Sequence, residues 1–302
     1  MTANSAVVSP STAIPYKPRK RWGEIIAPYL FISPFLISFI LLFLGPAVYS
    51  LVLSFFRFAG YGEATFVGVQ NYEKTLYYHV FWTQMRNVVQ YWVGHAIPLV
   101  VLAFLMAVLV NARSVKNKNL VKPLLFLPQL VAAVAAALLF KNFFGTNYGL
   151  LNTILGQQIP WLENMDIARW VVIIVIVWRG MAYWFVIFQA GLTSINTEVT
   201  EAAIVDGANA LQRLIFITIP LMRRTFLFFF VMDAIGSIRI FETPNVLGSN
   251  MGGLAPLQMA PVLNLVIDNI RNALFGQAAA TSWLLFIFIA FISWMQFRLF
   301  RD

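Results

Sequence analysis

The chain has 302 residues, of which 60% are hydrophobic and 11% are charged, whereas soluble proteins carry about a quarter charged residues. Its formal net charge of +9 fits the cationic cytoplasmic loops of membrane proteins better than nucleic-acid binding. The lack of cysteine excludes disulfides, zinc–thiolate sites, iron–sulfur clusters and a lipidated N-terminal cysteine.

Residues 1–21 precede the first apolar run and are predicted to form a disordered, basic cytoplasmic tail. The run that begins near Ala27 is longer than the core of a secretory signal, and no credible cleavage site of small residues follows it. We therefore expect it to remain as a helix. Residues 22–302 are predicted to form a single transmembrane domain.

Six apolar runs are close to the roughly 20 residues that a helix needs to cross the hydrocarbon core. They cover residues 27–54, 86–111, 121–143, 168–192, 220–241 and 276–297. The stretch 254–275 is also apolar, but its prolines and charged residues make it a poor lipid-exposed helix. We expect an extracytoplasmic or re-entrant segment there instead of a seventh span.

Lysine and arginine are distributed unevenly over the connecting segments. More of them lie in the segments on the same side of the membrane as the N-terminus. Because cytoplasmic segments carry an excess of lysine and arginine, this bias places both termini in the cytoplasm. It also places the polar connection between the fourth and fifth runs, residues 194–220, on the cytoplasmic face. The cations on this side are Lys17, Arg19, Lys20, Arg21, Arg113, Lys116, Lys118, Lys122, Arg213, Arg223, Arg224, Arg298 and Arg301.

The connection 194–220 contains the signals of two short helices joined by a turn. Its first helix has acidic residues near its start, at Glu198 and Glu201, where the helix dipole favours them. Gly207 can adopt a positive φ and so permits a turn, and Pro220 suits the first turn of the next span. Three polar residues are placed to cap the first helix: Ser194, Asn196 and Thr197.

The same connection follows the pattern E-A-A-x3-G-x9-I-x-I-P from Glu201 to Pro220. This pattern resembles the signature cytoplasmic loop of the membrane subunits of ABC importers, which docks in a cleft on the ATPase subunit. The resemblance implies that five residues couple the chain to such a motor: Glu201, Ala202, Ala203, Asp206 and Gly207. Other stretches resemble the carbohydrate-uptake branch, near the maltose and glycerol-3-phosphate permeases: Phe66–Tyr72, Leu124–Pro128, Gly149–Asn152, Val177–Gly180 and Ile235–Ser237.

The resemblance implies an all-α membrane protein with six transmembrane helices of the type I ABC importer permease fold. It implies that the protein is located in the bacterial or archaeal cytoplasmic membrane. The implied partners are a second homologous permease subunit, two ATP-binding subunits and an extracytoplasmic solute-binding protein, besides membrane lipid and a sugar substrate. The segment Val246–Gly253 departs from the usual V-L-T-G-G-G-P of that branch.

The sequence has no G-x4-G-K-[ST] phosphate loop. We therefore expect this chain to hold no cofactor and to be no enzyme, with ATP and Mg bound by the partner ATPases. His79 and His95 are too isolated for a metal site, and His95 is expected to donate a hydrogen bond inside the bundle. No cluster of catalytic type is apparent.

Ionisable residues near the centre of a span are costly, so they mark candidate substrate contacts. Arg179 and Asp233 lie near the middle of the fourth and fifth predicted spans, at similar depth. We predict that they face the bundle interior and interact, either as an ion pair between helices or with the substrate.

Further candidates lie toward the outer end of the fifth span. Arg239 and Glu242 are three residues apart, which predicts one helical face. Tyr183 is a candidate ring for sugar stacking, and Asn245 a weaker polar candidate.

Two alternatives remain open at this point. One is an ABC permease for a non-sugar solute, such as glycerol-3-phosphate or a polyamine. The other is a stand-alone secondary transporter or channel, in which Glu201 and Gly207 would not matter for transport. The sequence shows no internal repeat, which argues mildly against transporters built from duplicated halves.

Overall fold

The structure is a computed structural model that describes residues 22–112, 117–249 and 253–299. The predicted tail 1–21 therefore lies outside the described residues. So do residues 250–252, which belong to the segment 246–253 whose sequence differs from the usual pattern of that branch. The chain divides into two compact units, residues 1–49 and 50–302. Helix α1 (Trp22–Phe39) continues through the π-helical turn η1 (Ile40–Leu44) into α2 (Gly45–Leu53), which begins in the first unit and ends in the second.

Two π-helical turns, η1 and η2 (Leu214–Thr218), are each separated from a following proline by a single residue. Proline has no N–H, and its ring crowds the carbonyl four residues back. In both turns the residue before the proline instead donates its N–H to the carbonyl five residues back, Gly45 to Ile40 and Ile219 to Leu214. The wider turn lets the helix continue past Pro46 into α2, whereas the helix that contains Pro220 ends at Leu221.

Where the structure describes it, the second unit has a single small hairpin and its other regular elements are helices. Strands β1 (Phe56–Arg57) and β2 (Thr65–Phe66) pair antiparallel. The helices are α3 (Gln70–Tyr77), α4 (His79–Asn111), α5 (Lys118–Leu130), α6 (Ala133–Phe143), α7 (Leu150–Leu155), α8 (Met165–Thr193), α9 (Thr197–Val205), α10 (Ala210–Arg213), α11 (Ile219–Leu221), α12 (Arg223–Ile238), α13 (Glu242–Gly248), α14 (Leu263–Arg271) and α15 (Phe275–Leu299).

Among the described residues, four helices are long and apolar enough to cross a membrane: Ile26–Leu53, His79–Asn111, Met165–Thr193 and Phe275–Leu299. They match four of the predicted runs. The runs 121–143 and 220–241 are bent pairs instead, with angles of 89° between α5 and α6 and 65° between Ala210–Leu221 and α12. The nine-residue α14 is too short to span, so the stretch 254–275 contains no seventh span of this kind.

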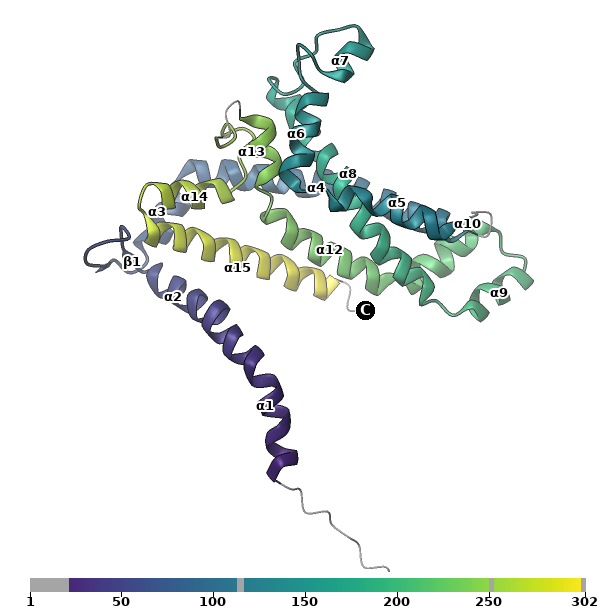
Figure 1. Cartoon of the computed structure of the whole chain (residues 1–302), viewed down its shortest axis with the longest axis horizontal. Coiled ribbons are helices and arrows are strands. Elements are labelled where there is room, and N and C mark those ends of the chain that lie inside the picture. The colour runs from purple at the N-terminus through teal and green to yellow at the C-terminus, as the bar shows by residue number, and fades with distance from the viewer. Residues whose placement is uncertain (1–21, 113–116, 250–252, 300–302) are drawn as a thin grey trace, which may run out of the picture. The chain divides into compact units, whose positions relative to one another are not determined.

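The core of the second unit lies where α4 packs along α8. Tyr91 of α4 and Phe188 of α8 have no exposed surface here, and the equally buried Phe229 of α12 packs against Phe188. Figure 1 shows α12 and α15 side by side, with α14 against α15 and α13 against α6. The packing brings the fourth and fifth predicted spans together with α4, and a cavity forms among them.

The segment 66–72 has a structural task. Gly68 has φ +56°, and Asn71 donates from Nδ2 to the backbone carbonyls of Ser54 and Phe56, both at 2.9 Å. Gly276 of α15 approaches the same strand so closely that a Cβ there would collide with the Phe56 carbonyl oxygen. The hairpin is thereby fixed to the start of α15.

Candidate functional site

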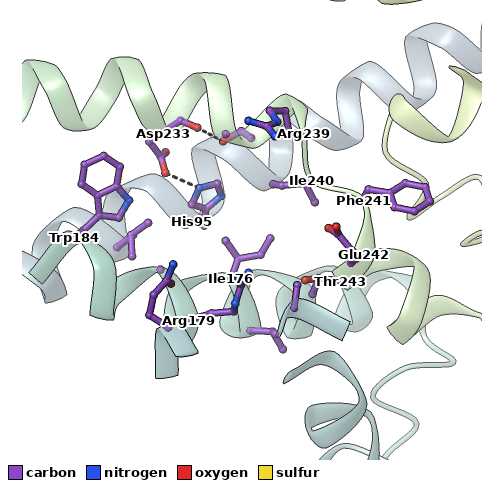
Figure 2. Close-up of a pocket in the computed structure, with 17 residues that line it drawn as sticks. His95, Ile176, Arg179, Trp184, Asp233, Arg239, Ile240, Phe241, Glu242 and Thr243 are labelled. Atoms are coloured by element: carbon purple, nitrogen blue, oxygen red, sulfur yellow. Dashed lines mark hydrogen bonds and ion pairs between the residues drawn. The ribbon is translucent and has the colours of Figure 1, made fainter. Parts of the chain in front are cut away.

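A cavity of about 230 Å³ lies between α4, α8, α12 and the start of α13. Figure 2 shows Arg179 and Trp184 on one wall and His95 with Asp233 on another. Charged and polar side chains are prominent in its lining, which is unusual for the interior of an apolar bundle. They are His95, Gln129, Arg179, Asp233, Ser237, Arg239, Glu242 and Thr243.

His95 and Asp233 form a buried pair across α4 and α12. His95 Nε2 lies 3.1 Å from Asp233 Oδ1, and both side chains are less than a tenth exposed. The other ring nitrogen, Nδ1, lies 2.6 Å from the backbone carbonyl of Tyr91. His95 therefore makes the hydrogen bonds inside the bundle that its sequence position predicted.

Arg179 and Asp233 both line the cavity, as predicted, but the direct ion pair between them is not formed in the described chain. Arg179 donates instead from Nε to the Val131 carbonyl at 3.1 Å. That carbonyl lies at the break between α5 and α6, where the helix leaves it without an intrahelical partner. Each of the two charged side chains therefore has another partner: Arg179 donates to the Val131 carbonyl, and Asp233 pairs with His95.

Arg239 and Glu242 also line the cavity, but the prediction that they share one helical face is wrong. Helix α12 ends at Ile238 and α13 begins at Glu242. The two residues are therefore separated by the non-helical connection between α12 and α13. Both side chains are exposed and line the cavity.

Tyr183 and Asn245 do not belong to the cavity lining. Tyr183 is 39% exposed and meets Trp184 edge to face at 5.0 Å, and it is Trp184 that lines the cavity. Asn245 is buried, exchanges hydrogen bonds with the Asn264 amide and accepts from the Ala255 N–H at 2.6 Å. Its side chain therefore fixes the segment that follows α13.

The connection 194–220 folds as two short helices joined by a turn, as its pattern predicted. Asn196 caps α9 by accepting from the Glu198 N–H at 3.0 Å, and Asn209 and Gln212 form a capping box on α10. Between them Gly207 has φ +81°, and a Cβ there would meet no atom within 4 Å. The turn thus needs glycine for its backbone conformation and not for space.

The exposed face of this segment mixes polar and apolar side chains. Glu201, Ala202 and Asp206 are exposed, whereas Ala203 is buried against the chain. Val205 is 86% exposed and Phe216 is 73% exposed, and a hollow of about 380 Å³ lies beside them at Asp206–Ala208, Gln212, Phe216 and Ile217. Large apolar side chains this exposed on a polar segment are typical of a contact surface.

Residues 91–301 match the family described as binding-protein-dependent transport system inner membrane component. The chain belongs to this family. The match covers the cavity, both bent pairs and the segment 197–213. As a member, the chain is a membrane permease subunit, several of whose helices have the length and composition to cross the bilayer.

Relatives match the permease along most of its length. The arabinooligosaccharides transport system permease protein AraP of Bacillus subtilis (strain 168) is 31% identical over 92% of this chain and 90% of that protein. The lactose transport system permease protein LacF of Rhizobium radiobacter is 29% identical over 94% of this chain and 96% of that protein.

A solved structure shows the same fold. It is a crystal structure of a bacterial ABC transporter involved in the import of the acidic polysaccharide alginate. The two chains align with a TM-score of 0.79 at 18% identity, over 93% of this permease and 98% of that chain.

The sequence alone did not single out several of the permease's cavity residues. Gln129 and Thr243 carry no distinguishing local pattern, and His95 signalled only a buried hydrogen bond. A polar residue within a predicted span was the available signal for His95 and Gln129, whereas Thr243 lies just beyond the run 220–241. On the segment 197–213, the sequence predicted the turn at Gly207 but not the high exposure of Val205 beside it.

Proposed function

We propose that this permease is half of the translocation path of an ATP-driven, binding-protein-dependent sugar importer. The observation that carries the substrate class is the match to two sugar permeases, AraP and LacF, over at least 90% of both chains. The cavity is consistent with a sugar, because its polar groups and the Trp184 ring supply hydrogen bonds and an apolar face.

The proposal includes six crossings, with both termini in the cytoplasm of a bacterial or archaeal cell. Four single helices and two bent pairs supply the crossings, and the distribution of cations supports the orientation. Broken helices at membrane depth are tolerated where protein or water surrounds them. At the break between α5 and α6, the protein itself satisfies the free Val131 carbonyl, because Arg179 donates a hydrogen bond to it.

The segment 197–213 is the proposed contact to the ATPase subunit. Its capped helices and glycine turn give a defined shape, and the exposed apolar side chains of Val205 within it and Phe216 just beyond it favour a protein partner. Glu201, Ala202, Asp206 and Gly207 lie on or beside this surface, while Ala203 would support it from within. Closure of two ATPase subunits on ATP would then move this segment and, through α12, the cavity wall.

The complete importer would contain a second homologous permease, two ATP-binding subunits and an extracytoplasmic binding protein. A crystal structure of the bacterial alginate ABC transporter in complex with a pentasaccharide-bound periplasmic protein has a chain that aligns with this one at a TM-score of 0.75. ATP and Mg would be bound by the partner ATPases, and sugar would pass between the two permeases.

Within this chain, Arg179, Asp233, Arg239 and Glu242 are the proposed substrate-path residues, since all four line the cavity. Tyr183 and Asn245 were predicted alongside them, and their positions favour support of Trp184 and of the segment after α13.

The experiment is reconstitution of the permease with its partner permease, ATPase and binding protein in liposomes. ATP hydrolysis and uptake are measured with lactose, an arabinose trisaccharide and glycerol-3-phosphate. Stimulation of both by a sugar, and its loss in Gly207→Pro, is the expected result. Uptake without ATP, or uptake that Gly207→Pro leaves intact, would favour the stand-alone transporter instead.

Glycerol-3-phosphate is the second candidate substrate. The sn-glycerol-3-phosphate transport system permease protein UgpA of Agrobacterium fabrum is 29% identical over 90% of this chain and 94% of that protein. Arg179 and Arg239 in the cavity are groups that bind phosphate well. Stimulation by glycerol-3-phosphate and by no sugar would select this candidate.

A further inference from the structure

The His95–Asp233 pair has a proton count that follows from its neighbours. The Tyr91 carbonyl can only accept a hydrogen bond, so His95 Nδ1, at 2.6 Å from it, carries a proton. One further proton is needed between His95 Nε2 and Asp233 Oδ1, since two lone pairs would repel each other. Whether that proton lies on the ring or on the carboxyl group, the pair as a whole is neutral.

The second oxygen of Asp233 is left without a partner. Asp233 Oδ2 is buried and has no hydrogen bond in the described chain. A buried carboxyl oxygen without a donor is costly and needs an explanation. In either proton arrangement Oδ2 remains an acceptor, so the group that it lacks is a hydroxyl or another hydrogen-bond donor.

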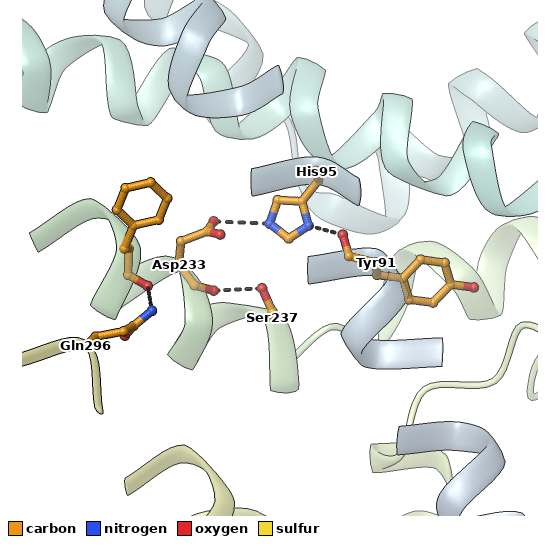
Figure 3. Close-up of polar contacts among 6 residues, drawn as sticks. Tyr91, His95, Asp233, Ser237 and Gln296 are labelled. Carbon is orange, nitrogen blue, oxygen red and sulfur yellow. Dashed lines mark hydrogen bonds and ion pairs between the residues drawn. The ribbon is translucent and has the colours of Figure 1, made fainter. Parts of the chain in front are cut away.

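The neighbouring groups restrict where that donor comes from. Figure 3 shows that the Ser237 hydroxyl, one turn away on α12, donates to the backbone carbonyl of Asp233 at 2.7 Å and not to its carboxyl group. Arg179 is held by the Val131 carbonyl. Neither group donates to Oδ2, and Asp233 lines the cavity, so a solute held there can supply the missing donor.

We propose that His95 is a positioning residue, which holds the Asp233 carboxyl group so that its free oxygen accepts a hydroxyl of the transported solute. The inference rests on the proposed function. His95 does not contact the solute itself. It orients Asp233, and the proton that lies between the two side chains keeps the His95–Asp233 pair neutral.

The test measures how many solute molecules the reconstituted importer moves per ATP hydrolysed, with radiolabelled lactose and arabinose trisaccharide. His95→Met removes both donors at similar volume, and His95→Gln keeps one N–H toward Asp233. We expect His95→Met to lower this ratio about tenfold or more, as loss of a hydrogen bond to a charged group would. ATP hydrolysis stimulated by the binding protein should stay within about twofold, and His95→Gln should recover much of the ratio.

Two variants serve as controls. His79→Met makes the same change at an exposed position of the same helix and should leave the ratio unchanged. Asp233→Asn should lower the ratio, and adding His95→Met to it should lower it little further, because His95 acts through Asp233. If His95→Met does not assemble, Asp233→Asn, which keeps a polar group there, is measured in its place.

Three results would overturn the inference. One is a ratio in His95→Met equal to that of the unchanged complex, as expected if only water meets Oδ2. The second is a parallel fall of transport and ATP hydrolysis, which would mean packing alone. The third is an undiminished effect of His95→Met in the Asp233→Asn background. Transport of glycerol-3-phosphate and of no sugar would instead refute the sugar assignment, and the same ratio would then be measured with that solute.

Discussion

Gly207 offers a sharp test of the coupling segment, because its replacement changes backbone conformation and nothing else. Its φ of +81° is unfavourable for a residue with a Cβ, yet that Cβ would meet no atom within 4 Å. An L-residue in the left-handed region costs about 1–2 kcal/mol. Gly207→Ala should therefore reduce the population of the native turn by about 5- to 30-fold relative to competing turns.

That reduction should appear as weaker binding of the ATPase. If the segment docks in its native shape, the apparent affinity of the permease for the ATPase falls by up to the same factor. The assay is a titration of labelled ATPase against the purified permease pair in lipid nanodiscs, followed by measurement of hydrolysis stimulated by the binding protein. Gly207→Asn should lose less, since asparagine tolerates positive φ better than alanine does.

Gly68→Ala is the matched control. Gly68 also has positive φ, at +56°, and no atom within 4 Å of a Cβ, but it lies between β2 and α3. The two variants should have similar conformational costs, and Gly207→Ala alone should weaken ATPase binding. Equal binding by Gly207→Ala and the unchanged permease, or an equal loss in Gly68→Ala, would refute the reasoning.

Three further predictions concern the architecture. Lys141→Met removes the ammonium that hydrogen-bonds two carbonyls at the end of α13; it should lower the thermal midpoint of the purified complex by a few degrees, and an unchanged midpoint would contradict this. Asn152→Ala deletes an amide that joins two backbone carbonyls and an indole N–H; hydrogen exchange in residues 144–164 should become faster, and unaltered protection would count against it. Gly276→Ala places a Cβ against the Phe56 carbonyl and should abolish the folded permease in membranes, while Gly253→Ala, which meets nothing, should express normally.

Local signals in the sequence predicted local structure well. Asn196 caps a helix and Gly207 takes a positive φ because each depends on its immediate chain neighbours. The apolar runs likewise predicted where span-length helices lie. These features follow from propensity and length alone.

Contacts between distant segments were not accessible in the same way. His95 meets Asp233 across 138 positions, and Arg179 meets Val131 across 48. The break at Val131 lies within a run predicted as one span, and Pro128 stands inside α5 three residues earlier, so it does not mark where the helix ends. Arg239 and Glu242 were paired on the assumption of a continuous helix, and the end of α12 at Ile238 removes that basis.

The turns before Pro46 and Pro220 also affect how such helices are compared. A helix advances about 100° per residue, so one additional residue in a widened turn shifts every later side chain around the axis by about that angle. A stripe of similar side chains that begins ahead of Pro46 therefore emerges on a different side beyond it. Periodicity summed across the whole helix will partly cancel, and a one-residue gap in an alignment at 40–44 can be a geometric correction instead of an error.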